Sequence, residues 1–160
     1  MQGIGLVNKD YNVFDGDHVD KNCTDTNPHI NPHQYSYNVG ILLQDTNGSS
    51  LWQERVDDLL TNIIKVFFPE GVAYEGSCEQ VEDVDKACTM DMKSSKGYVH
   101  CWMATTAQVT PFVKDRIIDV LKTSTAAAVK QRTGGANGRT CGFRWVTEQY
   151  DGTTGAGRRR

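Results

Sequence analysis

Asp57 and Asp58 are adjacent carboxylates, the residue type that performs acid and base chemistry on a glycosidic bond. Such a pair works only when its members flank the bond and burial raises the pKa of one of them. Here both residues fall on the charged side of an amphipathic helical pattern, where a solvated surface pair is expected. The sequence therefore presents no residue that we assign to catalysis.

A second acidic stretch and a pair of histidines could in principle bind a metal ion. The acidic stretch contains Glu79, Glu82, Asp83 and Asp85. It lacks the spaced oxygen ligands and the turn glycine of a known calcium loop, so a solvated loop is expected. His29 and His33 lie four residues apart, but the proline before each of them argues against a helix that presents both. We predict neither a metal site nor a cofactor.

Aromatic and amide side chains form the remaining pattern with chemical meaning, because flat rings pack against pyranose faces while amides and carboxylates bind sugar hydroxyls. They occur in the stretches "YSYN" and "VAYEGSCE" and around "QYDG". The candidate sugar-binding residues are Tyr35, Tyr37, Asn38, Tyr74, Glu75 and Asp151. The alternative is that these aromatic residues belong to the core, which their spacing alone favours.

The composition excludes several classes of protein. With 160 residues the chain is long enough for a core of its own, and we expect one domain over residues 1–160. A net charge of −3 and an isoelectric point near 5.8 give no electrostatic footprint for nucleic acid. No apolar run approaches the roughly 18 to 20 residues that span a bilayer. We therefore expect no nucleic-acid partner and no membrane span in this chain.

Cysteines and glycosylation motifs favour an oxidising, extracellular environment. The five cysteines are Cys23, Cys78, Cys88, Cys101 and Cys141, and none has the CxxC spacing of a zinc site. Cys78 and Cys88 are close together within one loop and are expected to form a disulfide. Acceptor motifs for N-glycosylation begin at Asn22 and Asn47 in polar sequence. A secreted protein explains both features, and the odd number of cysteines fits a piece of one.

Helical periodicity follows the first, polar part of the chain. A short helix is expected at "YSYNVGILL", and a longer one at "SSLWQERVDDLLTNIIKVFFP", where Ser50 and Gln53 form a capping box and Pro69 marks the end. The apolar stripe of the longer helix comprises Trp52, Val56, Leu59, Leu60, Ile63 and Phe67. A loop is expected over residues 69–93.

Two more helices are expected in the second half. The first covers residues 94–109, and the second has Thr110 as N-cap and Pro111 in its first position, and continues to about Arg132 before the glycine-rich "TGGANG". The buried face of the second is predicted to contain Phe112, Val113, Ile117, Val120 and Leu121. Because no strand ladder is recognisable, the predicted fold class is all-α.

Several motifs follow one another along the chain: "YNVFDG", "HQYSYNVGILL", "NGSSLWQERVDDLL", "ATTAQVTPF", and "TGGANGRTCGFRW" followed by "YDGTTGAG". In these motifs and in their order the chain resembles the fungal cell-wall members of glycoside hydrolase family 76, and the resemblance covers nearly its whole length. The resemblance implies an (α/α)6 barrel and hydrolysis or transfer of α-1,6-mannan with retention of configuration. It also implies secretion to, or glycolipid anchoring at, the fungal surface. The expected ligand is α-1,6-mannan or another mannose-containing glycan.

The resemblance also implies what this chain lacks. The aspartate pair of the family stands upstream of the matching segment, and Asp57 and Asp58 do not occupy its position. Tyr37, Asn38 and Asp151 match residues of the sugar groove. Arg132 stands where relatives often place a cysteine, which would leave Cys141 without its partner. The chain resembles part of the barrel, truncated at both ends, because "YDGTTGAG" reads as a helix entry that is followed only by three arginines.

Three hypotheses follow from these observations. The leading one is a partial mannan endo-1,6-α-mannosidase, whose segment 1–160 is inactive and poorly packed on its own because sides of its helices lack their partners. The second is a non-catalytic mannan-binding or scaffold protein, or the product of a decayed gene. The third is an unrelated secreted helical domain.

Overall fold

Five α-helices form most of the part of the chain that this computed structural model describes, residues 5–18, 29–44 and 50–153. They are α1 (Ser36–Gln44), α2 (Ser50–Phe67), α3 (Val84–Ala87), α4 (Met90–Val109) and α5 (Lys114–Lys130). Short 3-10 turns lie at Pro69–Gly71, Pro111–Val113 and Trp145–Thr147. The predicted all-α class is confirmed.

Two small antiparallel hairpins accompany the helices, although the sequence indicated no strand ladder. β1 (Gly16–His18) pairs with β2 (His29–Asn31), and β3 (Arg132–Gly134) pairs with β4 (Thr140–Cys141) around an irregular register. Strands of two or three residues are too short to show apolar alternation, which is why no sequence pattern revealed them.

Two differences at helix starts come from capping side chains. α4 begins four residues before the predicted position because the Thr89 hydroxyl accepts a hydrogen bond from the Met92 amide at 3.3 Å. The predicted loop over 69–93 also contains α3, whose N-cap is Asp83. Thr110 makes no capping bond, and a 3-10 turn separates it from α5. The predicted role of Ser50 in a capping box falls on a side chain outside the described residues.

The main core lies between α2, α4 and α5. Leu60, Ile63, Met103 and Ile117 are fully buried in it. The predicted burial of Trp52 and Phe112 is wrong, because they keep 37% and 48% of their surface exposed. Trp52 lies at the start of α2 and Phe112 lies just before the start of α5.

α1 packs closely against α4, and a glycine makes this approach possible. A Cβ atom at Gly40 would lie 2.7 Å from Cε3 of Trp102, so no larger residue fits without movement of the indole. The glycine that weakens the helical pattern in the sequence therefore has a packing reason.

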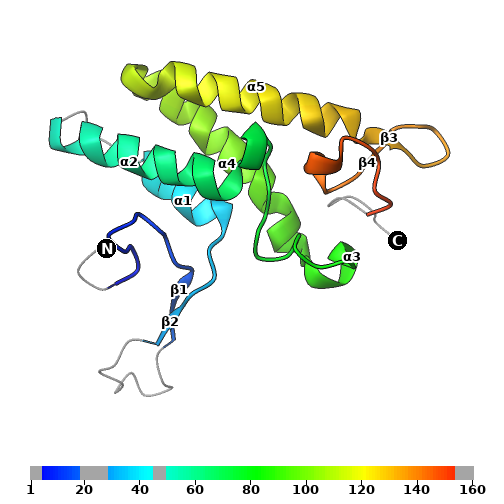
Figure 1. Cartoon of the computed structure of the whole chain (residues 1–160), viewed down its shortest axis with the longest axis horizontal. Helices are drawn as coiled ribbons and strands as arrows, with labels where there is room; N and C mark the ends of the chain where they lie inside the picture. Colours follow the sequence, from blue (N-terminus) through cyan, green and yellow to red (C-terminus); the bar gives the residue numbers. More distant parts are fainter. Residues whose placement is uncertain (1–4, 19–28, 45–49, 154–160) are drawn as a thin grey trace.

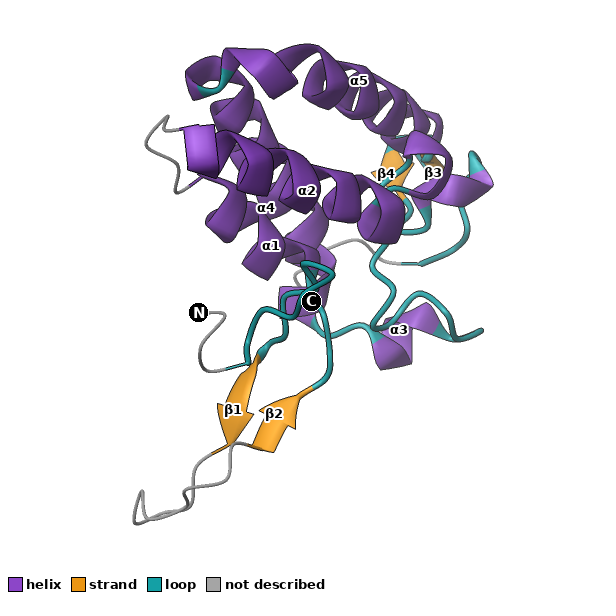
Figure 2. Ribbon diagram, turned by 60° about the vertical axis from the view of Figure 1, so that its left-hand side comes forward, coloured by secondary structure: helices purple, strands orange, loops and turns teal. Residues whose placement is uncertain are grey.

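The bundle gathers its long loops at one end. α1 and α4 begin there, α2 and α5 end there, and the β3–β4 hairpin lies beside them, toward the right of Figure 1. The β1–β2 hairpin projects from the bundle next to the start of α1 (Figure 2). None of the helices within the described residues is long and apolar enough to cross a membrane.

Candidate substrate-binding surface

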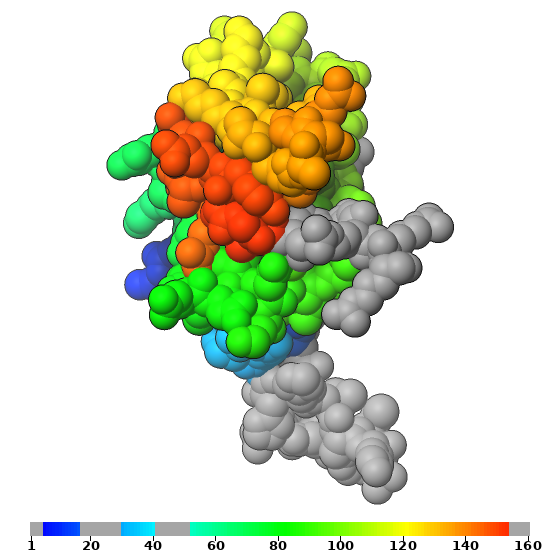
Figure 3. All heavy atoms as spheres, turned by 90° about the vertical axis from the view of Figure 1, so that its right-hand side faces the viewer, coloured from blue at the N-terminus to red at the C-terminus, as the bar shows by residue number. Residues whose placement is uncertain are grey.

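The loop end of the bundle carries all six candidate sugar-binding residues. They come from the start of α1, from the loop after α2 and from the segment after β4, which Figure 3 shows from the side where these segments meet. Segments that are more than a hundred residues apart in the sequence therefore contribute to one face.

Asp15 is the centre of a polar cluster on this face. Its carboxylate accepts hydrogen bonds from the Tyr37 hydroxyl at 3.4 Å and from Asn38 Nδ2 at 3.3 Å, both from the first turn of α1. A third donor is Asn31 Nδ2 of β2, at 3.1 Å. These hydrogen bonds restrain the three donor side chains. Asp15 itself is exposed, so the cluster is open to solvent.

Aromatic rings extend this cluster. The rings of Tyr35 and Tyr37 are stacked with centroids 6.0 Å apart, and His33 lies against Tyr35 at 6.4 Å. Burial raises the pKa of both tyrosines, and the charge of Asp15 raises it further, so their hydroxyls remain neutral donors at physiological pH. A row of rings beside fixed amide and carboxylate groups suits the apolar face and hydroxyl rim of a sugar.

Glu75 does not belong to the exposed surface, although the sequence singled it out as a sugar ligand. Its side chain is fully buried, and Oε2 accepts a hydrogen bond from the Ser36 hydroxyl at 2.9 Å. Burial raises the pKa of Glu75 to about 7, against the lowering effect of the Ser36 hydrogen bonds. Tyr74 is half-buried beside it, and burial raises the pKa of its hydroxyl as well.

A buried ion pair connects this loop to α4. Lys96 Nζ of α4 lies 2.7 Å from Glu79 Oε1 and donates to the Phe143 carbonyl oxygen at 2.7 Å. The ammonium group also lies over the Phe143 ring, 4.2 Å from its centroid. The expectation of a solvated acidic loop is therefore wrong for Glu79, whereas Glu82, Asp83 and Asp85 are exposed as expected.

A disulfide between Cys78 and Cys88 closes the same loop, with Cα atoms 5.1 Å apart. This is the pairing expected from their spacing. Cys101 and Cys141 are exposed thiols, and Cys23 lies outside the described residues, as do Asn22 and Asn47 of the glycosylation motifs. The disulfide and the ion pair together fix the segment that carries Tyr74 and Glu75.

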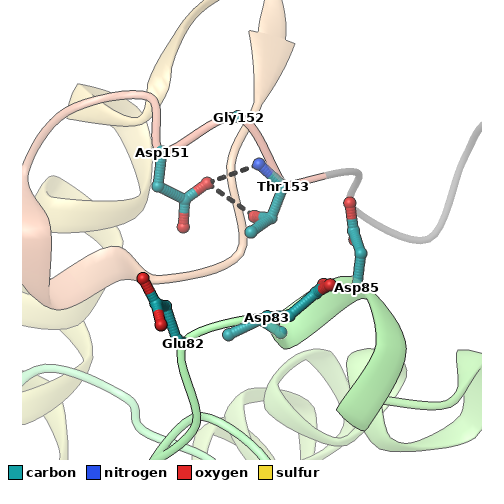
Figure 4. A pocket seen from close by; sticks show the side chains of 7 residues that line it. Glu82, Asp83, Asp85, Asp151, Gly152 and Thr153 are labelled. Carbon is teal, nitrogen blue, oxygen red and sulfur yellow. Dashed lines mark hydrogen bonds between the residues drawn. The ribbon is translucent and has the colours of Figure 1, made fainter.

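Asp151 lies on another part of the face, where it holds a turn. It accepts hydrogen bonds from the Thr153 amide at 3.0 Å, the Thr153 hydroxyl at 2.5 Å and the Arg144 amide at 2.9 Å. Burial raises its pKa, but these hydrogen bonds outweigh burial and the net shift is downward. Asp151 borders an open hollow of about 510 Å³ opposite Glu82, Asp83 and Asp85 (Figure 4).

The structure therefore brings three of the six candidates together and separates the others. Tyr35, Tyr37 and Asn38 form the cluster around Asp15, and no hydrogen bond within the described residues connects them to Asp151. Sequence reasoning missed Asp15 and Asn31 as members of the site. The available signal for Asp15 was its place in "YNVFDG", but its partners depend on a hairpin and a helix that only the fold brings together.

The remaining candidates are the carboxylates of α2 and the two histidines. Asp57 and Asp58 are exposed on α2, as predicted, and Asp57 pairs with Arg116 of α5. His33 is exposed, and the side chain of His29 lies outside the described residues. Within the part that the structure describes, no group of three or more His, Cys, Asp or Glu side chains could hold a metal ion.

Comparison with known proteins accounts for this architecture. The model of the glycosyl hydrolase family 76 matches residues 1–159. The mannan endo-1,6-alpha-mannosidases DCW1 and DFG5 of Saccharomyces cerevisiae are 36% and 33% identical over 98% and 97% of this chain. The crystal structure of Dfg5 from Chaetomium thermophilum in complex with glucosamine is 43% identical, with a TM-score of 0.82 over 97% of this chain.

These relatives are longer than the chain. It spans about a third of the two yeast mannosidases, 35% and 34%, and 39% of the Chaetomium thermophilum structure. The match nevertheless extends over nearly every residue of this chain and includes all the segments that form the loop face. The chain is a member of glycosyl hydrolase family 76, a family of glycosidases.

Proposed function

We propose that the loop face binds α-1,6-mannan, and that it does so as part of an endo-1,6-α-mannosidase that acts with retention of configuration. The observation that carries this proposal is the cluster around Asp15, where stacked rings of Tyr35 and Tyr37 lie beside an oriented amide of Asn38. The yeast relatives are mannan endo-1,6-alpha-mannosidases, which supports mannan as the ligand. A protein that encounters this polymer acts outside the cell, at the fungal surface, which the Cys78–Cys88 disulfide also favours.

Binding can be tested by calorimetric titration of residues 1–160 with α-1,6-linked mannooligosaccharides. Tyr37→Ala and Asn38→Ala should each weaken binding about tenfold or more, because each removes a group that is already oriented by Asp15. The matched control is Tyr98→Ala, which removes an exposed tyrosine from α4 that stacks on Trp102. Equal losses in all three variants, or no binding by the unaltered chain, would contradict the proposal.

We further propose that residues 1–160 do not hydrolyse mannan without other residues. Retaining hydrolysis needs two carboxyl groups about 5 to 5.5 Å apart across the bond. Asp57 is paired with Arg116 on the side of the bundle. Burial raises the pKa of Glu75 to about 7 but leaves this carboxyl group no exposed surface at which a substrate could reach it. Release of mannooligosaccharides by the purified chain, abolished in Asp57→Asn or Asp58→Asn, would overturn this proposal.

A non-catalytic mannan-binding or scaffold protein is the second candidate function. The same cluster favours it, since binding requires the groups around Asp15 and no catalytic pair. Sequencing of the full transcript distinguishes the two. An in-frame upstream segment with adjacent aspartates supports the enzyme, and its absence supports the binding protein.

A further inference from the structure

Glu75 is a buried acid at the junction of two segments that are 39 residues apart. Its Oε2 accepts a hydrogen bond from the Ser36 hydroxyl at 2.9 Å and faces the Ser36 backbone nitrogen at 3.5 Å. Ser36 is itself fully enclosed and lies between Tyr35 and Tyr37 in the sequence. Both hydrogen bonds therefore hold Ser36, the residue that lies between the two stacked tyrosines in the sequence.

The first turn of α1 needs an external acceptor. Amide groups at the start of a helix have no partner within it, and the helix dipole favours negative charge there. The residue before α1 is Tyr35, whose side chain is aromatic and cannot cap the turn as a serine or aspartate would. Glu75 supplies the missing acceptor from a distant loop, and its negative charge has the sign that the turn favours.

The charge of this acceptor changes within the physiological range of pH. Burial raises the pKa of Glu75 to about 7, the Ser36 hydrogen bonds oppose the shift, the neighbouring carboxylate of Glu79 adds to it and Lys96 of α4 opposes it. The Tyr35 hydroxyl is the other titratable group that senses Glu75, and burial keeps it neutral. Glu75 Oε1 has no hydrogen-bond partner within the described residues, so an oxygen is free to take up the proton.

We propose that Glu75 is a positioning residue that holds the first turn of α1 through Ser36, so that its ionisation tightens the sugar surface formed by Tyr35, Tyr37 and Asn38. Hydrogen bonds to a charged acceptor are roughly twice as strong as those to a neutral one, so the ionised carboxylate restrains Ser36 more firmly. A surface that is ordered before the ligand arrives loses less conformational freedom on binding. This inference rests on the proposed binding of mannan, and two experiments separate the failure of one from the failure of the other.

The first experiment tests the link between Glu75 and Ser36 without any ligand. Carbon-13 NMR of the glutamate side chains follows the titration of Glu75 in the intact chain and in Ser36→Ala. Because the Ser36 hydroxyl stabilises the ionised form, its removal should raise the pKa of Glu75 further. The control is Ser94→Ala, which removes a half-buried hydroxyl of α4 that donates to the Asp91 carbonyl oxygen and should leave this pKa unchanged. An unchanged pKa in Ser36→Ala overturns the inference and leaves the proposed function untouched.

The second experiment measures affinity for α-1,6-mannooligosaccharides between pH 5.5 and 8.5. The unaltered chain should bind about threefold to tenfold more tightly above the pKa of Glu75 than below it. Glu75→Gln keeps an acceptor oxygen but cannot ionise, so it should bind at the low-pH level throughout. The control Glu70→Gln alters an exposed carboxylate five residues earlier in the chain and should keep the pH dependence.

The outcomes are distinct. If Glu75→Gln retains the full pH dependence, or if the unaltered chain shows none, Glu75 does not position the surface. If no variant binds at any pH, the proposed function and the effect on affinity both fail, and the NMR titration alone decides whether Glu75 and Ser36 are coupled.

Discussion

Lys96 of α4 and Glu79 of the loop after α2 form an ion pair of 2.7 Å with both side chains buried. Burial lowers the pKa of Lys96 and raises that of Glu79, and each is partly restored by the charge of the other. Neither ion could remain in this place without its partner, because an uncompensated buried charge is far more costly than a solvated one. The pair therefore fixes the position of the loop relative to α4.

Lys96→Met should destabilise the chain by about 3 to 5 kcal/mol, because it leaves Glu79 buried without a cation. The double variant Lys96→Met/Glu79→Gln should recover part of the loss. Urea unfolding followed by circular dichroism gives the free energies, and Lys86→Met, at an exposed pair with Asp83, is the control that should change little. A loss in the double variant equal to or greater than that in Lys96→Met would show that the charge is not the cause.

The pH dependence of stability should carry an unfavourable contribution from Glu75. Its folded pKa of about 7 exceeds the unfolded value of 4.5, so the folded state binds more protons between these values and stability falls as pH rises through this window. The total is of order 3 kcal/mol. Unfolding measured from pH 4.5 to 8 should show Glu75→Gln gaining on the unaltered chain as pH rises; a constant difference would contradict this sign.

His100 contributes in the opposite direction over part of the same range. Burial lowers its pKa, so the unfolded state binds more protons and this contribution to stability is lost as pH falls through 6.5 and below. The comparison of Glu75→Gln with the unaltered chain at each pH removes the histidine contribution, because both proteins contain it.

The tautomer of His100 follows from its neighbours. Nδ1 lies 2.6 Å from the Lys96 carbonyl oxygen, which can only accept, so Nδ1 carries the proton. Nε2 lies 2.9 Å from the Ser124 hydroxyl, which already accepts from the Ala73 amide and can donate to the ring. Nitrogen-15 NMR at pH 7 should therefore show a neutral imidazole protonated at Nδ1; protonation at Nε2 would mean that the Ser124 bond runs the other way.

The β3–β4 hairpin should accept a cross-strand disulfide. Arg132 is the register partner of Cys141, and the Gly142 amide bonds the Gln131 carbonyl beside them, which identifies a pair whose side chains approach closely. Arg132→Cys should form a disulfide with Cys141 under oxidising conditions, and Thr133→Cys should not, because Thr133 falls in the irregular step between Arg132 and Gly134 and has no register partner. Mass mapping of non-reduced peptides tests this, and free thiols at both 132 and 141 would contradict it.

An apolar hollow of about 210 Å³ at the far end of the bundle should promote self-association of residues 1–160. It is lined in part by Trp52, Val109 and Phe112, which retain 37%, 61% and 48% exposure. The double variant Phe112→Ser/Val109→Ser should bind less of a dye that fluoresces on exposed apolar surface, and it should show a smaller fraction of oligomers in analytical ultracentrifugation. An unchanged fraction of oligomers would mean that another surface mediates the association.

The helices were determined largely by the sequence. The stripe from Val56 to Phe67 is strictly periodic, so burial of one face dictates α2 whatever surrounds it, and a loop with two cysteines ten residues apart can close on itself. The burial of Trp52 and Phe112 was mispredicted. Periodicity specifies which face of a helix is apolar, but it does not specify how far along the helix a neighbouring element covers that face.

Only the tertiary structure decided which polar residues are exposed and which are buried. Glu75 and Glu79 belong to one acidic, loop-like sequence with Glu82 and Asp83, yet the first two are enclosed because α4 presents Lys96 and α1 presents Ser36 at that place. The same holds for Asp15, which became the centre of a polar cluster through partners 16 to 23 residues away. Charge and hydrogen-bonding capacity are properties of a residue, but desolvation and partner geometry depend on segments that only folding brings together.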